Sequence, residues 1–163
     1  MAFDAHTYFE SIRDKNKMLI AGNYKYCRVT GLANMEDVIT SFKKEKAYFC
    51  VDATEDGDTF QSAGGAFMER RVHTLFVLKK FPYNDMPAQD EALNECRQIY
   101  RSILRKLVRD RALLENEMVY LQVLRIPFHE IPGYAISGCT GLYFNVTIDI
   151  PIDLCYKSDE WTE

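Results

Sequence analysis

Residues 52–58 carry side-chain oxygens at the spacing with which a calcium-binding loop begins. Oxygen ligands stand at loop positions 1, 3 and 5, and Gly57 stands at position 6, where an EF-hand loop turns sharply. Position 12 is Ala63 instead of the glutamate that supplies two oxygens, and strand-like segments flank the loop where an EF-hand needs helices. An Asp-Gly pair between two strands favours a hairpin. The pattern therefore predicts a long hairpin arm whose acidic tip carries Asp52, Glu55, Asp56 and Asp58.

The three histidines show no active-site pattern. His6 falls on an expected surface helix, and His73 falls within an expected strand. His129 and Glu130 begin like the zinc motif H-E-x-x-H, but the second histidine is missing and Pro132 would break the required helix. The segment SAGGAF lacks the phosphate-loop pattern, and no G-x-S-x-G sequence occurs. We therefore expect no catalytic residue, no metal and no cofactor, and a Cys50–His73 dyad would rest on adjacency alone.

Length and composition predict one soluble domain over residues 1–163, with a core of about residues 4–153 and a short acidic tail at 157–163. The N-terminus lacks the apolar region of a signal peptide, and no apolar run approaches the roughly 18 residues of a membrane helix. The cysteines are five, an odd number, and widely spaced, which favours reduced core thiols. A net charge of −4 argues against general affinity for nucleic acid.

Four arginines recur at four-residue intervals along an expected long helix. Like charges at this spacing oppose helix formation by a few tenths of a kcal/mol per pair. These arginines either interact favourably with the helix dipole at the C-terminal end, or meet an acidic surface on another subunit, where arginine makes bidentate contacts with carboxylates. The acidic hairpin tip is the candidate for that surface. This arginine stripe consists of Arg97, Arg101, Arg105 and Arg109.

Hydrophobic periodicity and the turn residues predict eight elements in the order α-β-α-β-β-α-β-β. The strand at 142–153 alternates strictly, with Leu142, Phe144 and Val146 expected in the core and Asn145 and Thr147 facing solvent or a partner. Because the hairpin-like pairs need no crossover, we expect an α+β fold with a largely antiparallel sheet and helices on one face. The expected helices are 4–17, 34–46 and within 81–110, the strands are 23–30, 47–53, 66–80, 118–126 and 142–153, and residues 127–138 are expected to be a loop.

The long helix, the aromatic strands and the segments VTGLANMEDVITSFKKEKAYFCVDAT and GGAFMERRVHTLFVLKKF together resemble the tail terminator, or tail completion, family of minor tail proteins from bacteriophages and prophages. The similarity covers about residues 5–153 and lies in element order and general character. It implies an α+β fold whose sheet is flanked by helices, and a hexameric ring that caps the tail tube and joins it to the head. It also implies no catalysis and no cofactor.

The resemblance implies that the partners are copies of the chain itself, the tail tube and head–tail connector proteins, with DNA only in passage and no membrane. The protein would lie in the cytoplasm of a bacterial host during assembly and then in the virion tail. The acidic tip would face either a neighbouring subunit or the ring opening. Two alternatives remain open: a module that stacks single-stranded nucleic acid on Tyr24, Tyr26 and Tyr143 beside Arg28, and an undescribed hydrolase centred on the His129 loop.

Overall fold

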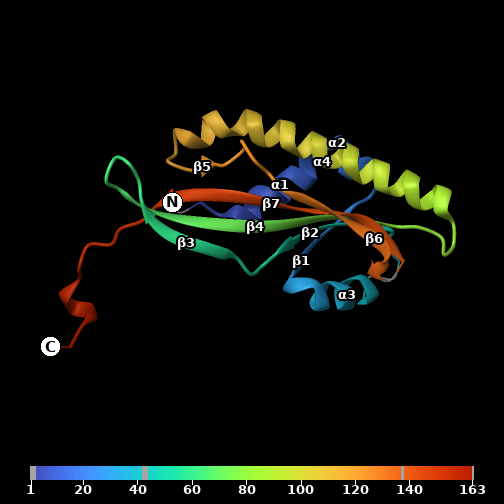
Figure 1. Cartoon of the computed structure of the whole chain (residues 1–163), viewed down its shortest axis with the longest axis horizontal. Coiled ribbons are helices and arrows are strands. Elements are labelled where there is room, and N and C mark those ends of the chain that lie inside the picture. The colour runs from blue at the N-terminus through green and yellow to red at the C-terminus, as the bar shows by residue number, and fades with distance from the viewer. Residues whose placement is uncertain (1–2, 42–43, 137, 163) are drawn as a thin grey trace.

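The chain forms one mixed sheet of seven strands with helices on both faces (Figure 1). The structure is a computed structural model that describes residues 3–41, 44–136 and 138–162. The strand order is β1-β2-β4-β7-β5, with β3 beside β4 and β6 beside β7, and β1 alone runs parallel to its described neighbour. The α+β fold with a mostly antiparallel sheet is thus confirmed. The strands are β1 (Lys25–Val29), β2 (Ala47–Asp52), β3 (Asp56–Gln61), β4 (Phe67–Lys80), β5 (Tyr120–Leu121), β6 (Phe128–Ile136) and β7 (Cys139–Pro151).

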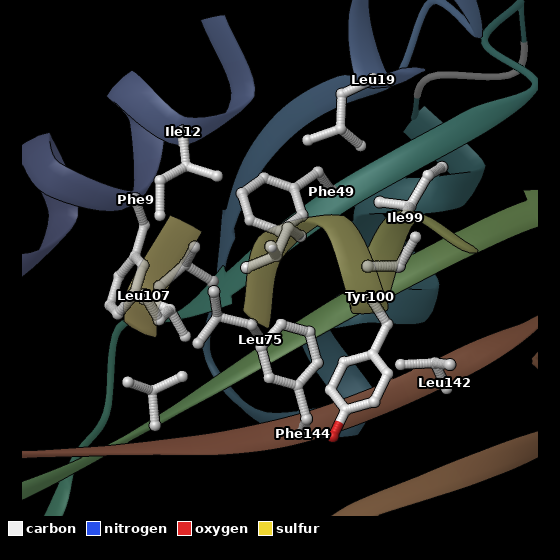
Figure 2. Close-up of a cluster of buried hydrophobic side chains, with 14 of the residues drawn as sticks. Phe9, Ile12, Leu19, Phe49, Leu75, Ile99, Tyr100, Leu107, Leu142 and Phe144 are labelled. Carbon is white, nitrogen blue, oxygen red and sulfur yellow. The ribbon is translucent and has the colours of Figure 1, made fainter. Parts of the chain in front are cut away.

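Three helices cover the first face of the sheet: α1 (Ala5–Lys15), α2 (Lys17–Ala21) and the long α4 (Met86–Glu115) (Figure 1). The Asp85 carboxylate caps α4 by accepting a hydrogen bond from the backbone N–H of Ala88. The buried side of α4 follows the expected three- and four-residue spacing. Figure 2 shows its side chains meeting those of α1, α2 and the sheet in the larger core, among them Phe9, Leu19, Phe49, Leu75, Ile99, Leu107 and Phe144.

The second face of the sheet carries α3 (Gly31–Ser41), so the expectation of helices on one face is wrong. Alternation along β2 explains this, because every residue of the strand is buried and its side chains need cover on both sides. Phe49 and Val51 enter the larger core, whereas Tyr48 and Cys50 enter a second core with α3. This second core consists of Cys27, Val29, Met35, Ile39, Tyr48, Cys50, Phe76, Leu78, Ile131, Ile136 and Cys139.

Several element bounds differ from those expected. The helix predicted at 4–17 is divided at Asn16, whose side chain caps α2 through the N–H groups of Met18 and Leu19. The helix predicted at 34–46 begins earlier and ends at Ser41, while residues 42–43 lie outside the described residues. The strand predicted at 118–126 is reduced to β5, and the loop predicted at 127–138 contains β6. A short 3-10 helix, Ser158–Glu160, lies in the C-terminal segment.

Candidate subunit interface

The arm, defined as residues 56–72, is a hairpin of β3 and the first part of β4, and its turn is not acidic. Ser62 donates its N–H to the Ala66 carbonyl, and Gly65 donates its N–H to the Ser62 carbonyl, with Gly65 at φ +86°. The turn therefore lies at 62–66, in the teal-green loop at one end of the sheet in Figure 1. The long arm is confirmed, but the prediction of an acidic tip is wrong.

Local geometry explains why the acidic residues lie within the strands. Asp52 ends β2, where its carboxylate accepts hydrogen bonds from both the N–H and the hydroxyl of Thr54, so the chain kinks and continues along β4. Gly57 sits in β3, where a Cβ would lie 2.3 Å from the Arg70 carbonyl oxygen. The Asp-Gly pair thus marks a close approach between strands rather than a turn.

Some of the acidic residues have partners within the chain. Glu55 contacts the Arg71 guanidinium at 3.4 Å, and Arg71 also pairs with Glu69. Asp52 is buried, whereas Asp56 and Asp58 are exposed and form no ion pair with any residue that the structure describes. Asp56 and Asp58 are therefore the members of the predicted acidic set that remain available to a partner.

Arg70 fastens the arm to the sheet. Its guanidinium makes a bidentate pair with Asp149, at 2.8 Å from Nε to Oδ1 and 2.9 Å from the second nitrogen to Oδ2. The side-chain amide of Gln122 donates a third hydrogen bond to Asp149 at 2.8 Å, and Asp149 is buried. The carboxylate of Asp149 raises the pKa of Arg70 above its usual value. The sequence pattern did not predict the contacts among Arg70, Asp149 and Gln122. The alternation of β7 did place Asp149 on the outward face, beside Asn145 and Thr147.

One half of the second sheet face has no helix over it. Figure 1 shows α3 beneath the end of the sheet that carries β1 and β6, while at the other end the short 3-10 helix of the C-terminal segment lies away from the sheet and does not cover it. Strand register places four cross-strand rows on this open face: Phe60–Met68–Pro151, Asp58–Arg70–Asp149–Tyr120, Asp56–Val72–Thr147 and Thr74–Asn145. Thr74 donates its hydroxyl to the Asn145 side chain at 3.1 Å. Apart from the apolar row next to the turn of the arm, the open face is thus mostly polar, partly hydrogen-bonded within itself and continuous with the arm.

The arginine stripe divides into one paired residue and three unpaired ones. Arg97 makes a bidentate pair with Glu130 on β6, which raises the pKa of Arg97 and lowers that of Glu130. Arg101, Arg105 and Arg109 are exposed and have no ion pair among the described residues. Helix α4 packs on the first face of the sheet, whereas the strand register places Asp56 and Asp58 on the second face, so the stripe and the arm's acidic residues do not meet within one chain.

A small pocket of about 250 Å³ brings His6, His73, Glu55 and Arg71 together beneath the arm. Nδ1 of His73 lies 3.3 Å from a Glu55 carboxylate oxygen but out of line for a hydrogen bond, and Nδ1 of His6 is also buried without one. Burial lowers the pKa of His73, against the opposing effect of Glu55. The sequence placed His6 on a surface helix, and its half-buried position at this pocket departs from that prediction.

The tyrosines named for the nucleic-acid alternative do not form a common surface. Tyr24 is fully buried, with its hydroxyl donating to Glu95, so it cannot stack on a base. Tyr26 packs against the larger core and Tyr143 against the second core, so they point to opposite faces of the sheet. His129 stacks on Tyr143 with 5.0 Å between ring centroids.

The cysteines follow the prediction in part. All five are free thiols, and Cys27, Cys50, Cys96 and Cys139 are buried as expected. Cys155 is exposed in the C-terminal segment, so it is not a core residue. Burial raises the pKa of Cys96 to about 12 and that of Cys139 to about 11, which keeps both thiols protonated at neutral pH.

No family model and no curated protein matches this chain. Within the described ranges 3–41, 44–136 and 138–162, no helix is both long enough and apolar enough to cross a membrane.

Proposed function

We propose that this chain is a non-enzymatic structural subunit of a phage or prophage tail, which assembles with copies of itself into a ring that ends the tail tube and joins it to the head. The observation that carries the proposal is the arm. All residues of β3 are exposed except Phe60, which is half-buried, although the strand is fully paired with β4 along its length. A paired strand that buries so little in one chain is suited to contact another chain.

A ring requires two different surfaces on each subunit, because head-to-tail contacts are heterologous. The arm with the open face offers one surface, which carries the exposed Asp56 and Asp58. The exposed side of α4 offers the other, with Arg101, Arg105 and Arg109. The two surfaces lie on opposite sides of the sheet, so a neighbour can supply the opposite charge to each. Electrostatic complementarity of this kind steers association and fixes register more than it adds affinity.

Charge reversal tests the proposal on the full-length chain. Arg101→Glu with Arg105→Glu should leave the circular dichroism spectrum unchanged but abolish rings in electron micrographs and the ring-sized species in analytical ultracentrifugation, or prevent attachment to purified tail tubes. Adding Asp56→Arg and Asp58→Arg to the same chain should restore assembly.

The matched control is Lys44→Glu with Arg125→Glu, two exposed reversals outside both surfaces, which should assemble normally. Normal assembly by the Arg101→Glu, Arg105→Glu chain at both low and high salt would show that the stripe is not an interface. A chain that neither self-associates nor binds tail tubes under any condition would refute the structural role itself.

A further inference from the structure

The C-terminal segment, residues 152–162, leaves the sheet after β7 and extends away from the rest of the molecule (Figure 1). Ile152 still donates its N–H to the Phe67 carbonyl, and beyond it the segment carries large apolar side chains in solvent. Leu154 is 53% exposed, while Tyr156 and Trp161 are each 66% exposed and stack on each other. A free segment that exposes two aromatic residues is typical of a docking peptide, since Trp and Tyr dominate binding energy at interfaces.

The segment is also acidic. In the sequence after Ile152 there are four carboxylates, Asp153, Asp159, Glu160 and Glu163, against the single lysine Lys157. Glu160 and Lys157 lie 3.5 Å apart on the surface, so that pair is worth little. Trp161 is thus surrounded in sequence by negative charge, and its best receptor is an apolar cavity with a basic rim.

Such a cavity lies where α1 and α2 meet α4. We call it the lysine cleft, and its volume is about 280 Å³, suited to one aromatic side chain. Ile12 and Met18 supply its apolar lining, and the side-chain amide of Asn16 donates to the Ser102 hydroxyl at 3.0 Å across it. Lysines form its rim: Lys15, Lys17 and Lys106.

The charge of the cleft is only partly neutralised by the residues that the structure describes. Lys106 pairs with the buried Asp110, but Lys15 and Lys17 are exposed and form no ion pair with any residue described in the structure. Arg109 stands three residues after Lys106 on α4, so the arginine stripe continues the same positive surface. The aromatic, acidic C-terminal segment and the apolar, basic lysine cleft therefore match in both size and charge.

We propose that the C-terminal segment of one copy docks on a second copy of this chain, with Trp161 in the lysine cleft and its neighbouring carboxylates on Lys15 and Lys17. A second copy is the occupant because Figure 1 shows the segment leaving on the side of the sheet opposite α4 and α2, which bound the cleft. This inference rests on the proposed self-assembly and adds a second contact to it, independent of the arm.

Trp161 is the only tryptophan of the chain, so its fluorescence reports on the docking directly. In the wild-type chain, emission should shift to shorter wavelength, and acrylamide quenching should fall, as protein concentration rises. Trp161→Ala should weaken self-association by at least about tenfold, as expected for a buried tryptophan anchor. Tyr83→Ala, which removes an aromatic ring that is 92% exposed elsewhere, is the matched control and should have no effect.

A mixing experiment separates docking on a second copy from docking on the same chain. The donor is full-length Lys15→Glu, Lys17→Glu, which keeps Trp161 but has a reversed cleft, and the acceptor is full-length Trp161→Ala, which has an intact cleft and no tryptophan signal. The donor's emission should be solvent-like alone and shift only when the acceptor is added. Adding Asp159→Lys and Glu160→Lys to the donor should restore the shift without any acceptor.

Three results would overturn the inference. One is a shielded Trp161 in a sample that analytical ultracentrifugation shows to be monomeric, which means docking within one chain. Another is a donor that shifts alone without the compensating lysines, which places the receptor elsewhere. The third is a Trp161 that stays solvent-exposed at all concentrations. If rings form while Trp161 stays exposed, the proposed function survives and only this inference fails, whereas a chain that never self-associates refutes both.

Discussion

Arg70 and Asp149 provide a quantitative test of how the arm is joined to the core. Their bidentate pair links β4 to β7, and Gln122 adds a bond from the segment after β5. The Asp149 side chain is 5% exposed and that of Arg70 is 38% exposed. The carboxylate is therefore desolvated, whereas part of the guanidinium remains in water above the Phe60 ring.

Replacing Arg70 by Met keeps the aliphatic stem but leaves Asp149 buried with only the Gln122 amide. Breaking a fully buried pair costs about 3–5 kcal/mol, and the partial exposure of Arg70 reduces the expected cost to about 2–3 kcal/mol. Asp149→Asn keeps the volume and one acceptor and should cost about 2 kcal/mol, since hydrogen bonds to charged groups contribute about 1.5–3 kcal/mol. Because both changes remove the same ion pair, the double variant should cost about 1–2 kcal/mol less than the sum of the two single variants.

Urea unfolding followed by far-UV circular dichroism measures these free energies, since the single tryptophan lies in the exposed C-terminal segment and does not report on the core. Arg71→Met is the control, because the Arg71 side chain is 45% exposed and its partners Glu55 and Glu69 are only partly buried, so its loss should cost below about 1 kcal/mol. Additive costs in the double variant, or equal costs for Arg70→Met and Arg71→Met, would refute the assigned role of the buried carboxylate.

Further predictions concern the core, the arm and the pocket beneath it. Phe144→Ala should cost about 3–5 kcal/mol because the ring is fully buried against Tyr100, whereas Asn145→Ala on the open face should cost about 1 kcal/mol or less; equal values would contradict the face assignment. Gly57→Ala should cost about 1–3 kcal/mol in the same urea titration, because its Cβ would meet a carbonyl oxygen of β4, while Gly64→Ala, in open space, should be neutral. Because the pKa of His73 is lowered in the folded chain, the unfolded chain binds the proton more readily, and stability should fall as pH drops through about 6.5. The variant His73→Gln should flatten this dependence of the melting temperature on pH between about pH 7.5 and 5.5. Calorimetry should detect no calcium binding tighter than about millimolar, because the loop lacks the bidentate ligand; micromolar, stoichiometric binding would contradict the strand geometry.

Hydrophobic periodicity predicted the long helix and the long strands well, because in each of them one side packs against the core and the other does not. The alternation of β7 placed Leu142, Phe144, Val146, Ile148 and Ile150 in the core. The first four are buried, and Ile150 packs against the larger core while remaining partly exposed. Strand β6 escaped prediction because Pro132 interrupts the pattern, and the pairing with β7 tolerates it through a register shift between Ile131 and Ile136.

The candidate interface was harder to predict because its features depend on contacts between distant residues. The Asp-Gly signal at 56–57 is local, but the need for Gly57 comes from the carbonyl of Arg70 on the facing strand. The partner of Arg97 is Glu130, on a segment that sequence reasoning treated as a loop. Spacing along one helix identified the arginines, but only the tertiary structure separates the paired one from the three that are unpaired among the described residues.

The continuous pairing of β4 has a mechanical consequence. From Met68 to Lys80 each residue of β4 has a partner on β7, so the strand that forms the arm is also a central strand of the sheet, with no loop between the two. A contact surface built in this way is preorganised, and little conformational entropy is lost when it meets a neighbour. The C-terminal segment is the opposite case, because it leaves the sheet after β7 and is mostly exposed, so the docking proposed above would fix it in place. Subunits joined through both contacts would be held in one orientation by the rigid arm, while the C-terminal segment could span different distances between neighbours.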